Sequence, residues 1–285
     1  MIRSEEVELP QGRIRYRETG EGEPIVFVHG FLVDGRLWSG TAEELSASHR
    51  CILPDWPLGA HRVAMNESAD LTPPGIANLI ADFLEALELD GVTLVGNDSG
   101  GAMSQVMVTR RPERVARLVL TNCDTHSNFP PGPFKAMPPI AKLPGGMTAL
   151  ALPFRIGALR RAAFAPFAKS KIPPDLIDSW MQPSQSDRAV ARDTAKVTAG
   201  MHKRHTLEAA EKLARFDRPV LFAWAPGDRV FPLKYAQRLA ETIPEARIEK
   251  IEGAKTFVPL DQPQRLAELI GAFVGAGAGA AESKA

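Results

Sequence analysis

Short apolar runs alternate with amphipathic stretches along most of the chain, which is the pattern of a protein with mixed strands and helices. Runs that are apolar at nearly every position predict strands buried on both faces, as in a parallel sheet. Alternating positions near the start predict an antiparallel hairpin instead. The predicted hairpin strands are 7–9 and 14–18, and the predicted buried strands are 24–30, 51–54, 92–95, 115–122, 219–225 and 246–251.

Helices are expected between these strands, where apolar residues recur every three or four positions. In the clearest example, Pro73 and Pro74 precede a stretch in which Ile76, Phe83 and Leu87 share one face. Pro is well tolerated in the first turn of a helix, so this pair predicts a helix start. The other predicted helices are 37–46, 101–109, 233–242 and 263–273. The alternation predicts a parallel sheet with helices on both faces.

The alternation breaks at a Pro-rich stretch, residues 129–133. From there to about residue 216 the chain is rich in Pro, Ala and Arg and shows helical pieces without a convincing strand. We therefore predict an α/β core made of residues 1–129 and 216–274, with a helical lid, 130–215, inserted into it. Residues 275–285 are mostly Gly and Ala, which predicts a flexible tail.

Composition and charge exclude several classes of function. The chain has 285 residues, of which 44% are hydrophobic, enough for a sizeable core. Basic and acidic residues number 34 each, so no net positive field favours nucleic acid as a partner. Because the chain starts with polar residues, we expect no secretory leader, and because it lacks a long apolar run, we expect no membrane span. Two cysteines make a disulfide framework or a thiolate metal site unexpected.

From these properties we expect a cytoplasmic protein, monomeric or homodimeric. Its expected partner is a small-molecule substrate rather than a membrane or a nucleic acid, and no metal or cofactor is predicted.

Residues 92–101, Val-Thr-Leu-Val-Gly-Asn-Asp-Ser-Gly-Gly, carry the most specific chemical signal. A β-prone run ends at Gly96, Gly100 follows four positions later, and Asp98 lies between them. This is the spacing of a nucleophile elbow, in which strand and helix approach too closely for a Cβ at the small positions. The register selects the Asp98 carboxylate, not the Ser99 hydroxyl, as the reactive group. A helix N-cap is the plainer role for Asp98.

Two further motifs accompany the elbow: His-Gly-Phe, ending at Phe31 after an early strand, and Gly-Asp, containing Asp228 after a late one. Together the three motifs resemble the α/β-hydrolase superfamily over nearly the whole chain before the tail. The resemblance implies a mostly parallel eight-stranded sheet with an inserted helical lid. It also implies an oxyanion hole formed by the backbone N–H groups of Phe31 and Ser99, and an acid, Asp228, that orients a base. Core packing for Phe31 and a turn for Asp228 are the plainer roles.

An Asp at the elbow resembles the branch that contains haloalkane dehalogenases, fluoroacetate dehalogenases and epoxide hydrolases. In that branch the carboxylate attacks carbon to form an ester, which water activated by His then cleaves. The chain departs from each of these families. Ser99 stands where haloalkane dehalogenases usually have Trp, no Arg occurs near Asp98 before Arg110, and the lid contains no Tyr.

The position of the base also departs from the superfamily pattern. A Gly-His-Phe motif is common there, but this chain has Lys255-Thr256-Phe257, so Thr256 replaces the His. A Thr hydroxyl cannot act as a general base near pH 7. His126, just past the strand at 115–122, is the first candidate to replace it, followed by His61. Asp124 is a candidate alternative or auxiliary acid, since some dehalogenases place theirs after this strand.

Three functions remain open. The first is a hydrolase for a small, largely apolar substrate, with Asp98 as nucleophile or as base toward water. The second is a lyase, isomerase or cyclase in which Asp98 is a general base, which needs a raised Asp98 pKa. The third is a catalytically weakened binding protein, which a salt bridge between Asp98 and Lys255 favours. Trp180 and Phe257 are the predicted apolar substrate contacts.

Overall fold

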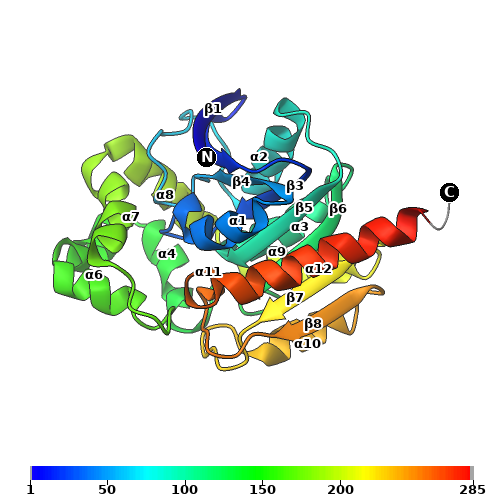
Figure 1. Ribbon diagram of the computed structural model, residues 1–285. Helices are drawn as coiled ribbons and strands as arrows, with labels where there is room; N and C mark the ends of the chain where they lie inside the picture. Colours follow the sequence, from blue (N-terminus) through cyan, green and yellow to red (C-terminus); the bar gives the residue numbers. More distant parts are fainter. Residues whose placement is uncertain (1, 283–285) are drawn as a thin grey trace.

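The computed structural model describes residues 2–282, and its centre is one eight-stranded sheet (Figure 1). The strand order is β1-β2-β4-β3-β5-β6-β7-β8; β2 pairs antiparallel with β1 and β4, and every other pairing is parallel. The predicted fold class is confirmed. The strands are β1 (Arg3–Leu9), β2 (Gly12–Thr19), β3 (Glu23–Val28), β4 (His49–Pro54), β5 (Val92–Asp98), β6 (Val115–Cys123), β7 (Val220–Trp224) and β8 (Ala246–Lys250).

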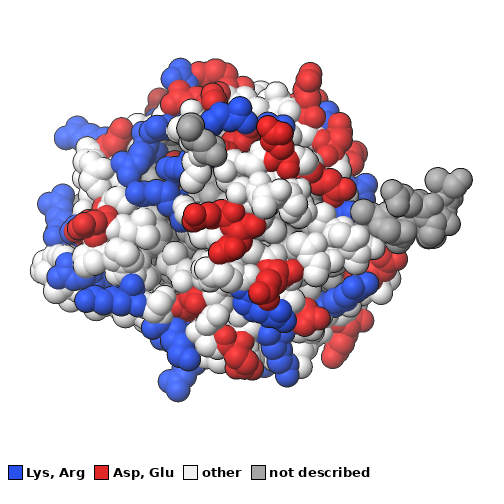
Figure 2. Space-filling view, viewed as in Figure 1, with Lys and Arg blue, Asp and Glu red and all other residues white. Residues whose placement is uncertain are grey.

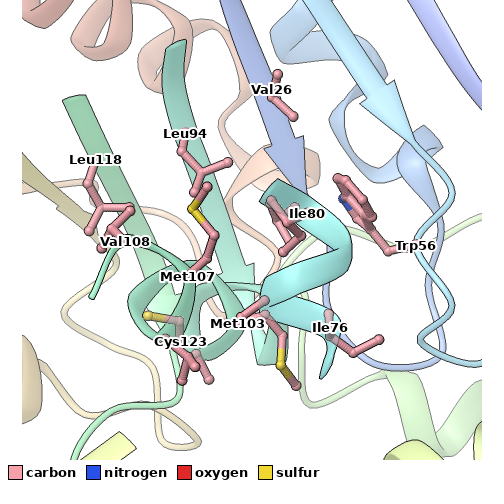
Figure 3. Packing of buried hydrophobic residues seen from close by; sticks show 14 of the residues in the cluster. Val26, Trp56, Ile76, Ile80, Leu94, Met103, Met107, Val108, Leu118 and Cys123 are labelled. Atoms are coloured by element: carbon pink, nitrogen blue, oxygen red, sulfur yellow. The ribbon is translucent and has the colours of Figure 1, made fainter. Parts of the chain in front are cut away.

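Helices cover both faces of the sheet. The elements outside the lid are η1 (Gly35–Trp38), α1 (Ser39–Leu45), α2 (Pro73–Ala86), α3 (Ser99–Val108), α9 (Lys203–Leu213), α10 (Leu233–Ala240), α11 (Val258–Asp261) and α12 (Pro263–Glu282). Because side chains alternate along a strand, Val26 of β3 joins the core under α2 and α3, whereas its neighbour Phe27 joins the core under α1 and α12. Figure 3 shows the first core, where Ile80 of α2 and Met107 of α3 lie against Leu94 of β5.

The lid is helical and lies to one side of the sheet, around the labels α4, α6, α7 and α8 in Figure 1. Its elements are η2 (Gly132–Ala136), α4 (Met137–Ala141), α5 (Gly146–Ala151), η3 (Leu152–Arg155), α6 (Gly157–Phe164), α7 (Pro174–Ser186) and α8 (Arg188–Gly200). The prediction carried the lid to residue 215, but α9 packs on α3 instead. Ala209, Ala210 and Leu213 of α9 belong to the core beside the sheet. The two Ala side chains are small, so α9 and α3 can approach closely.

The C-terminal segment differs from the prediction. A helix was expected to end at residue 273 and a flexible tail to follow, but α12 continues to Glu282. Ala is the strongest helix former, and a helix that is already nucleated extends at little cost through a Gly-Ala stretch. Residues 283–285 of the predicted tail lie outside the described residues. Within residues 2–282, no helix combines the length and apolarity that crossing a membrane requires.

The lid and the sheet domain are joined through buried polar groups. Asp34, which caps η1, accepts hydrogen bonds from Arg36 and, at 3.1 Å, from the Trp180 indole of α7. Asp193 of α8 is fully buried and accepts from the Met65 backbone at 2.7 Å and from the His61 ring at 3.4 Å. A buried carboxylate is costly without partners, so these contacts fix the lid on the sheet domain.

Replacing Gly100 with Ala tests the close approach that the elbow requires. A Cβ at this position would lie 2.3 Å from the backbone oxygens of both Val28 and His29, which cannot move without distorting β3. We expect Gly100→Ala to lower the free energy of unfolding by about 3 kcal/mol, the upper end for overpacking, in urea denaturation. Gly271→Ala in α12 is the matched control: its nearest neighbour would be 3.7 Å away, and a gain of roughly 0.5–1 kcal/mol is expected. Equal stability of Gly100→Ala and wild type would contradict the close approach.

Candidate active site

The elbow lies where β5 ends and α3 begins. Asp98 has φ 53° and ψ −132°, a strained conformation for a residue with a side chain, and the next residue, Ser99, starts α3. The turn depends on glycines: a Cβ on Gly30 would lie 2.3 Å from Asp98 Oδ2, and one on Gly96 would lie 2.7 Å from the Cα of Gly101. The turn therefore presents the Asp98 side chain at the carboxyl edge of the sheet.

A cavity of about 770 Å³ lies between this edge and the lid. Phe31, Asp98, Ser99 and Asp124 line it from the sheet domain. The lid contributes mostly apolar side chains, among them Phe134, Met137, Met147, Leu150, Phe154, Phe164, Phe167 and Met181. Polar and charged lid residues also line it, including Ser184, Gln185, Arg155, Arg188 and Arg192. The lining combines a mostly apolar wall with three carboxyl groups, those of Asp98, Asp124 and the lid residue Asp187, a composition suited to a small organic molecule.

Burial dominates the electrostatics of Asp98. The side chain is 8% exposed, and loss of hydration raises its pKa to about 7. The negative charge of Asp228 raises the pKa further, whereas the backbone N–H groups of Ser99 and Phe31 oppose the rise. Both N–H groups are those predicted for the oxyanion hole, and they face the Asp98 carboxyl. The Ser99 hydroxyl donates to Asp98 Oδ1 at 3.4 Å.

Asp124 is a second carboxyl group beside Asp98. It follows β6, its backbone N–H lies 3.3 Å from the Asp98 carbonyl oxygen, and its side chain is fully buried. Neither carboxyl oxygen of Asp124 has a hydrogen-bond partner among the described residues. Burial, and then the charge of Asp98, raise the pKa of Asp124 well above its ordinary value. The Ser99 hydroxyl opposes this rise in the pKa of Asp124, but burial is the largest effect and favours the neutral form of the carboxyl group.

Asp228 and Thr256 form a separate polar network behind the elbow. The Thr256 hydroxyl donates to Asp228 Oδ2 at 2.8 Å, and Asn122 donates to the same oxygen at 3.0 Å. Asn97 donates to the Thr256 carbonyl at 2.7 Å, which holds this loop against β5. Burial raises the pKa of Asp228, while the Val230 N–H and the Thr256 hydroxyl are the largest effects opposing the rise. Thr256 therefore provides a hydrogen-bond donor to the Asp228 carboxyl, but its hydroxyl cannot act as a base near neutral pH.

No histidine of the described chain lines the cavity. The expectation that His126 reaches the pocket is not met: its backbone adopts φ 49°, its ring faces the Thr125 hydroxyl at 2.7 Å, and burial lowers its pKa. His61 is bound to Asp193 at 3.4 Å. His29 is fully buried, contacting the Gly30 carbonyl and accepting from the Trp56 N–H. Each of these three rings contacts other protein groups, and none of them faces the cavity.

Of the two predicted apolar substrate contacts, only Phe257 lines the cavity. Its ring stacks on Phe167 at 5.5 Å between ring centroids. Trp180 does not line the cavity: the side chain is fully buried, packs on Phe164 and donates to Asp34, so it supports the wall from behind. Its indole N–H needed a buried acceptor, which the sequence did not identify.

Two residues of the site, Asn97 and Asn122, were not identified from the sequence. They hold Thr256 and Asp228 in place, and their only sequence signal was a polar residue in an otherwise apolar strand.

The salt bridge considered between Asp98 and Lys255 is not formed among the described residues, where the Lys255 backbone N–H donates to Asp261 at 3.0 Å. No group of three or more His, Cys, Asp or Glu in residues 2–282 is arranged to hold a metal ion.

The family model described as alpha/beta hydrolase fold matches residues 23–263. The chain belongs to this family. Haloalkane dehalogenase 2 of Mycobacterium tuberculosis is 27% identical over 274 residues, which cover 91% of each chain. A 2-hydroxy-6-oxo-2,4-heptadienoate hydrolase of Pseudomonas putida is 39% identical over 114 residues, 36% of this chain and 38% of that one.

Solved structures of this family superpose on most of the chain. That of the haloalkane dehalogenase DatA from Agrobacterium tumefaciens C58 has a TM-score of 0.79 at 20% identity and covers 96% of this chain and 97% of that one. At this identity the structural likeness establishes the α/β hydrolase fold. The family and its hydrolase-named relatives support an enzymatic role, with the substrate left to the chemistry of the site.

Removing the buried charge at Asp98 should stabilise the fold at neutral and higher pH. Because the folded-state pKa is raised from 3.8 to about 7, stability is full below the unfolded pKa and is lost as pH rises through about 7. We expect Asp98→Asn to match wild type near pH 4 and to exceed its free energy of unfolding by up to about 4 kcal/mol near pH 8. Denaturant titration across this range measures the difference; a constant difference would contradict the raised pKa.

Proposed function

We propose that the chain is a hydrolase of small, largely apolar esters or lactones, with Asp98 as general base toward water and Asp124 as general acid. The observation that carries the proposal is the pair of buried carboxyl groups lining one mostly apolar cavity, Asp98 with its pKa raised to about 7 and Asp124 with its pKa raised well above the ordinary value. Two carboxyls whose environments separate their pKa values are a general solution for acid and base roles in one site.

The usual two-step route of the Asp-nucleophile branch fits this site poorly. An ester formed on Asp98 needs a base to activate the second water, and Thr256 supplies only a hydroxyl already donated to Asp228. No histidine of the described residues lines the cavity. A covalent intermediate on Asp98 would therefore accumulate, whereas a single-step hydrolysis has no such requirement.

The proposed step conserves atoms and protons. Ionised Asp98 takes a proton from water as the water oxygen attacks the acyl carbon of the substrate. The bond from that carbon to the alkoxy oxygen breaks, and Asp124 gives its proton to this oxygen. The products are an acid and an alcohol, and a proton then passes from Asp98 to Asp124, restoring both groups. The Ser99 hydroxyl, which hydrogen-bonds Asp98, is placed to carry that proton.

The substrate class is inferred from Asp124, the proposed general acid, and from the lining of the cavity. A neutral Asp124 helps a leaving group that needs a proton, such as an alkoxide, and helps a halide little. The cavity of about 770 Å³ and its Phe and Met side chains favour an apolar body over a charged one. A relative named for heptadienoate hydrolysis is consistent with carbonyl chemistry, while the dehalogenase relatives make alkyl halides the comparison to include.

A non-hydrolytic proton transfer is the second candidate. It is favoured by the same raised Asp98 pKa, since a carboxylate base works best with a pKa near the operating pH. Hydrolysis in water enriched in ¹⁸O separates the two, because only hydrolysis puts solvent oxygen into the product.

We expect ester and lactone turnover to rise with pH through about 7, where Asp98 ionises, and to fall at higher pH where Asp124 loses its proton. Asp98→Asn and Asp124→Asn should each lower kcat/KM by about 10²- to 10⁴-fold, the range for a general acid or base. In Asp124→Asn the decline at high pH should also disappear. Asp90→Asn, an exposed carboxylate paired with Arg114, is the control and should leave kcat/KM unchanged.

Single-turnover hydrolysis in ¹⁸O-enriched water distinguishes base from nucleophile. As general base, Asp98 stays unlabelled and the first product carries the label. Label in the Asp98 carboxyl, or an intact-mass adduct that persists in wild type and clears in Thr256→His, would refute the single-step route and establish covalent attack. Unchanged turnover in Asp98→Asn would refute both.

A further inference from the structure

The first part of the lid, residues 130–174, carries charge of one sign. Between residues 130 and 174 the sequence contains no Asp or Glu and seven basic residues, namely Lys135, Lys142, Arg155, Arg160, Arg161, Lys169 and Lys171. Since the chain as a whole has a formal net charge of zero, the rest of the molecule carries the balancing negative excess. Figure 2 shows this separation: Lys and Arg are spaced around the lid side, and Asp and Glu are more frequent over the sheet domain.

The same segment exposes large apolar side chains. Five such residues are exposed in the described chain, and four of them lie in the lid: Leu143 at 61%, Leu152 at 58%, Ile156 at 58% and Leu159 at 45%. Leu143 precedes α5, Leu152 starts η3, Ile156 follows η3, and Leu159 belongs to α6. The consecutive elements α5, η3 and α6 pack on one another. In α6 itself only Phe164 is buried, so this helix presents most of its surface to solvent. We call these four residues, together with Lys142, Arg155, Arg160 and Arg161, the lid face.

Three of the four basic residues of the lid face form no ion pair within the described residues. Lys142, Arg155 and Arg161 are exposed and form no salt bridge within residues 2–282. Arg160 alone is paired, with Asp178 of α7 at 2.8 Å, and it is the half-buried member of the set. Their charge is therefore available to an external anionic partner.

We propose that the lid face docks on an anionic phospholipid surface and admits apolar substrate to the cavity from it. Lys and Arg near such a surface each contribute about a fivefold factor in partitioning, and exposed Leu and Ile insert at the boundary of the acyl chains. A protein partner fits the pattern less well, because the centres of protein interfaces are enriched in aromatic residues and Met, whereas the exposed apolar residues of the lid face are Leu and Ile.

The lid face is continuous with the cavity. Leu152 and Arg155 are exposed at the surface and also line the cavity, so the mouth opens where the apolar and basic residues gather. An apolar molecule dissolved in a bilayer would reach the cavity without crossing water. This inference concerns peripheral docking and is independent of the proposed hydrolysis, since vesicle binding requires no turnover.

Co-sedimentation of the full chain with vesicles tests the proposal. We expect binding to vesicles of phosphatidylcholine mixed with phosphatidylglycerol, little binding to phosphatidylcholine alone, and weakening with added salt. Lys142→Glu combined with Arg161→Glu should lower the partition coefficient by at least about thirtyfold, since two favourable charges become unfavourable. Neither residue lines the cavity, and both are exposed, so folding and turnover of a soluble substrate should be preserved.

Two matched variants complete the experiment. Arg247→Glu with Lys250→Glu makes the same charge change on exposed positions of β8 and should leave binding near the wild-type value. Leu143→Ser with Leu159→Ser should weaken binding at high salt as well as low. No binding to anionic vesicles, equal binding to neutral ones, or wild-type binding by the Glu variant would overturn the proposal. So would a dimer, seen by sedimentation velocity, that Leu143→Ser with Leu159→Ser abolishes.

Discussion

The site depends on the removal of water from Asp98. The elbow fixes the carboxyl at the edge of the sheet, and the apolar lid closes over it, so hydration is lost and the pKa rises to about 7. Asp124 is fully buried beside it, and burial, followed by the charge of Asp98, raises its pKa well above the ordinary value. Loss of hydration is therefore the largest effect on both carboxyl groups.

The network behind the elbow explains why loss of the usual base leaves the fold intact. Asp228 keeps four donors, from Thr256, Asn122, Val230 and Phe231, so its buried carboxyl remains satisfied without an imidazole. Thr256 is smaller than His and is fully buried, and Asn97 holds its carbonyl. The network around Asp228 is therefore satisfied without an imidazole, and in the proposed mechanism the acid–base roles belong to Asp98 and Asp124.

Local signals in the sequence were sufficient for the fold class and the mostly parallel sheet, because buried strands are marked by their apolar runs. Gly96 and Gly100 implied a close approach of strand and helix, which the contacts of an added Cβ at each position agree with. Asp124 was predicted as an alternative or auxiliary acid, and the sequence did not indicate its complete burial. Trp180 and His126 were misplaced: a chain position near a strand end does not say which way a side chain turns. The end of α12 was misjudged because Gly and Ala are common to tails and helices.

The central claim is that burial raises the pKa of both Asp98 and Asp124, and infrared spectroscopy of the carboxyl groups tests it directly. With ¹³C-labelled aspartate, protonated carboxylic acid bands should persist in wild type at about pH 6, above the ordinary pKa of Asp, and should lose intensity in both Asp98→Asn and Asp124→Asn. Absence of these bands in wild type at that pH would mean that both carboxyls are ionised and would contradict the account.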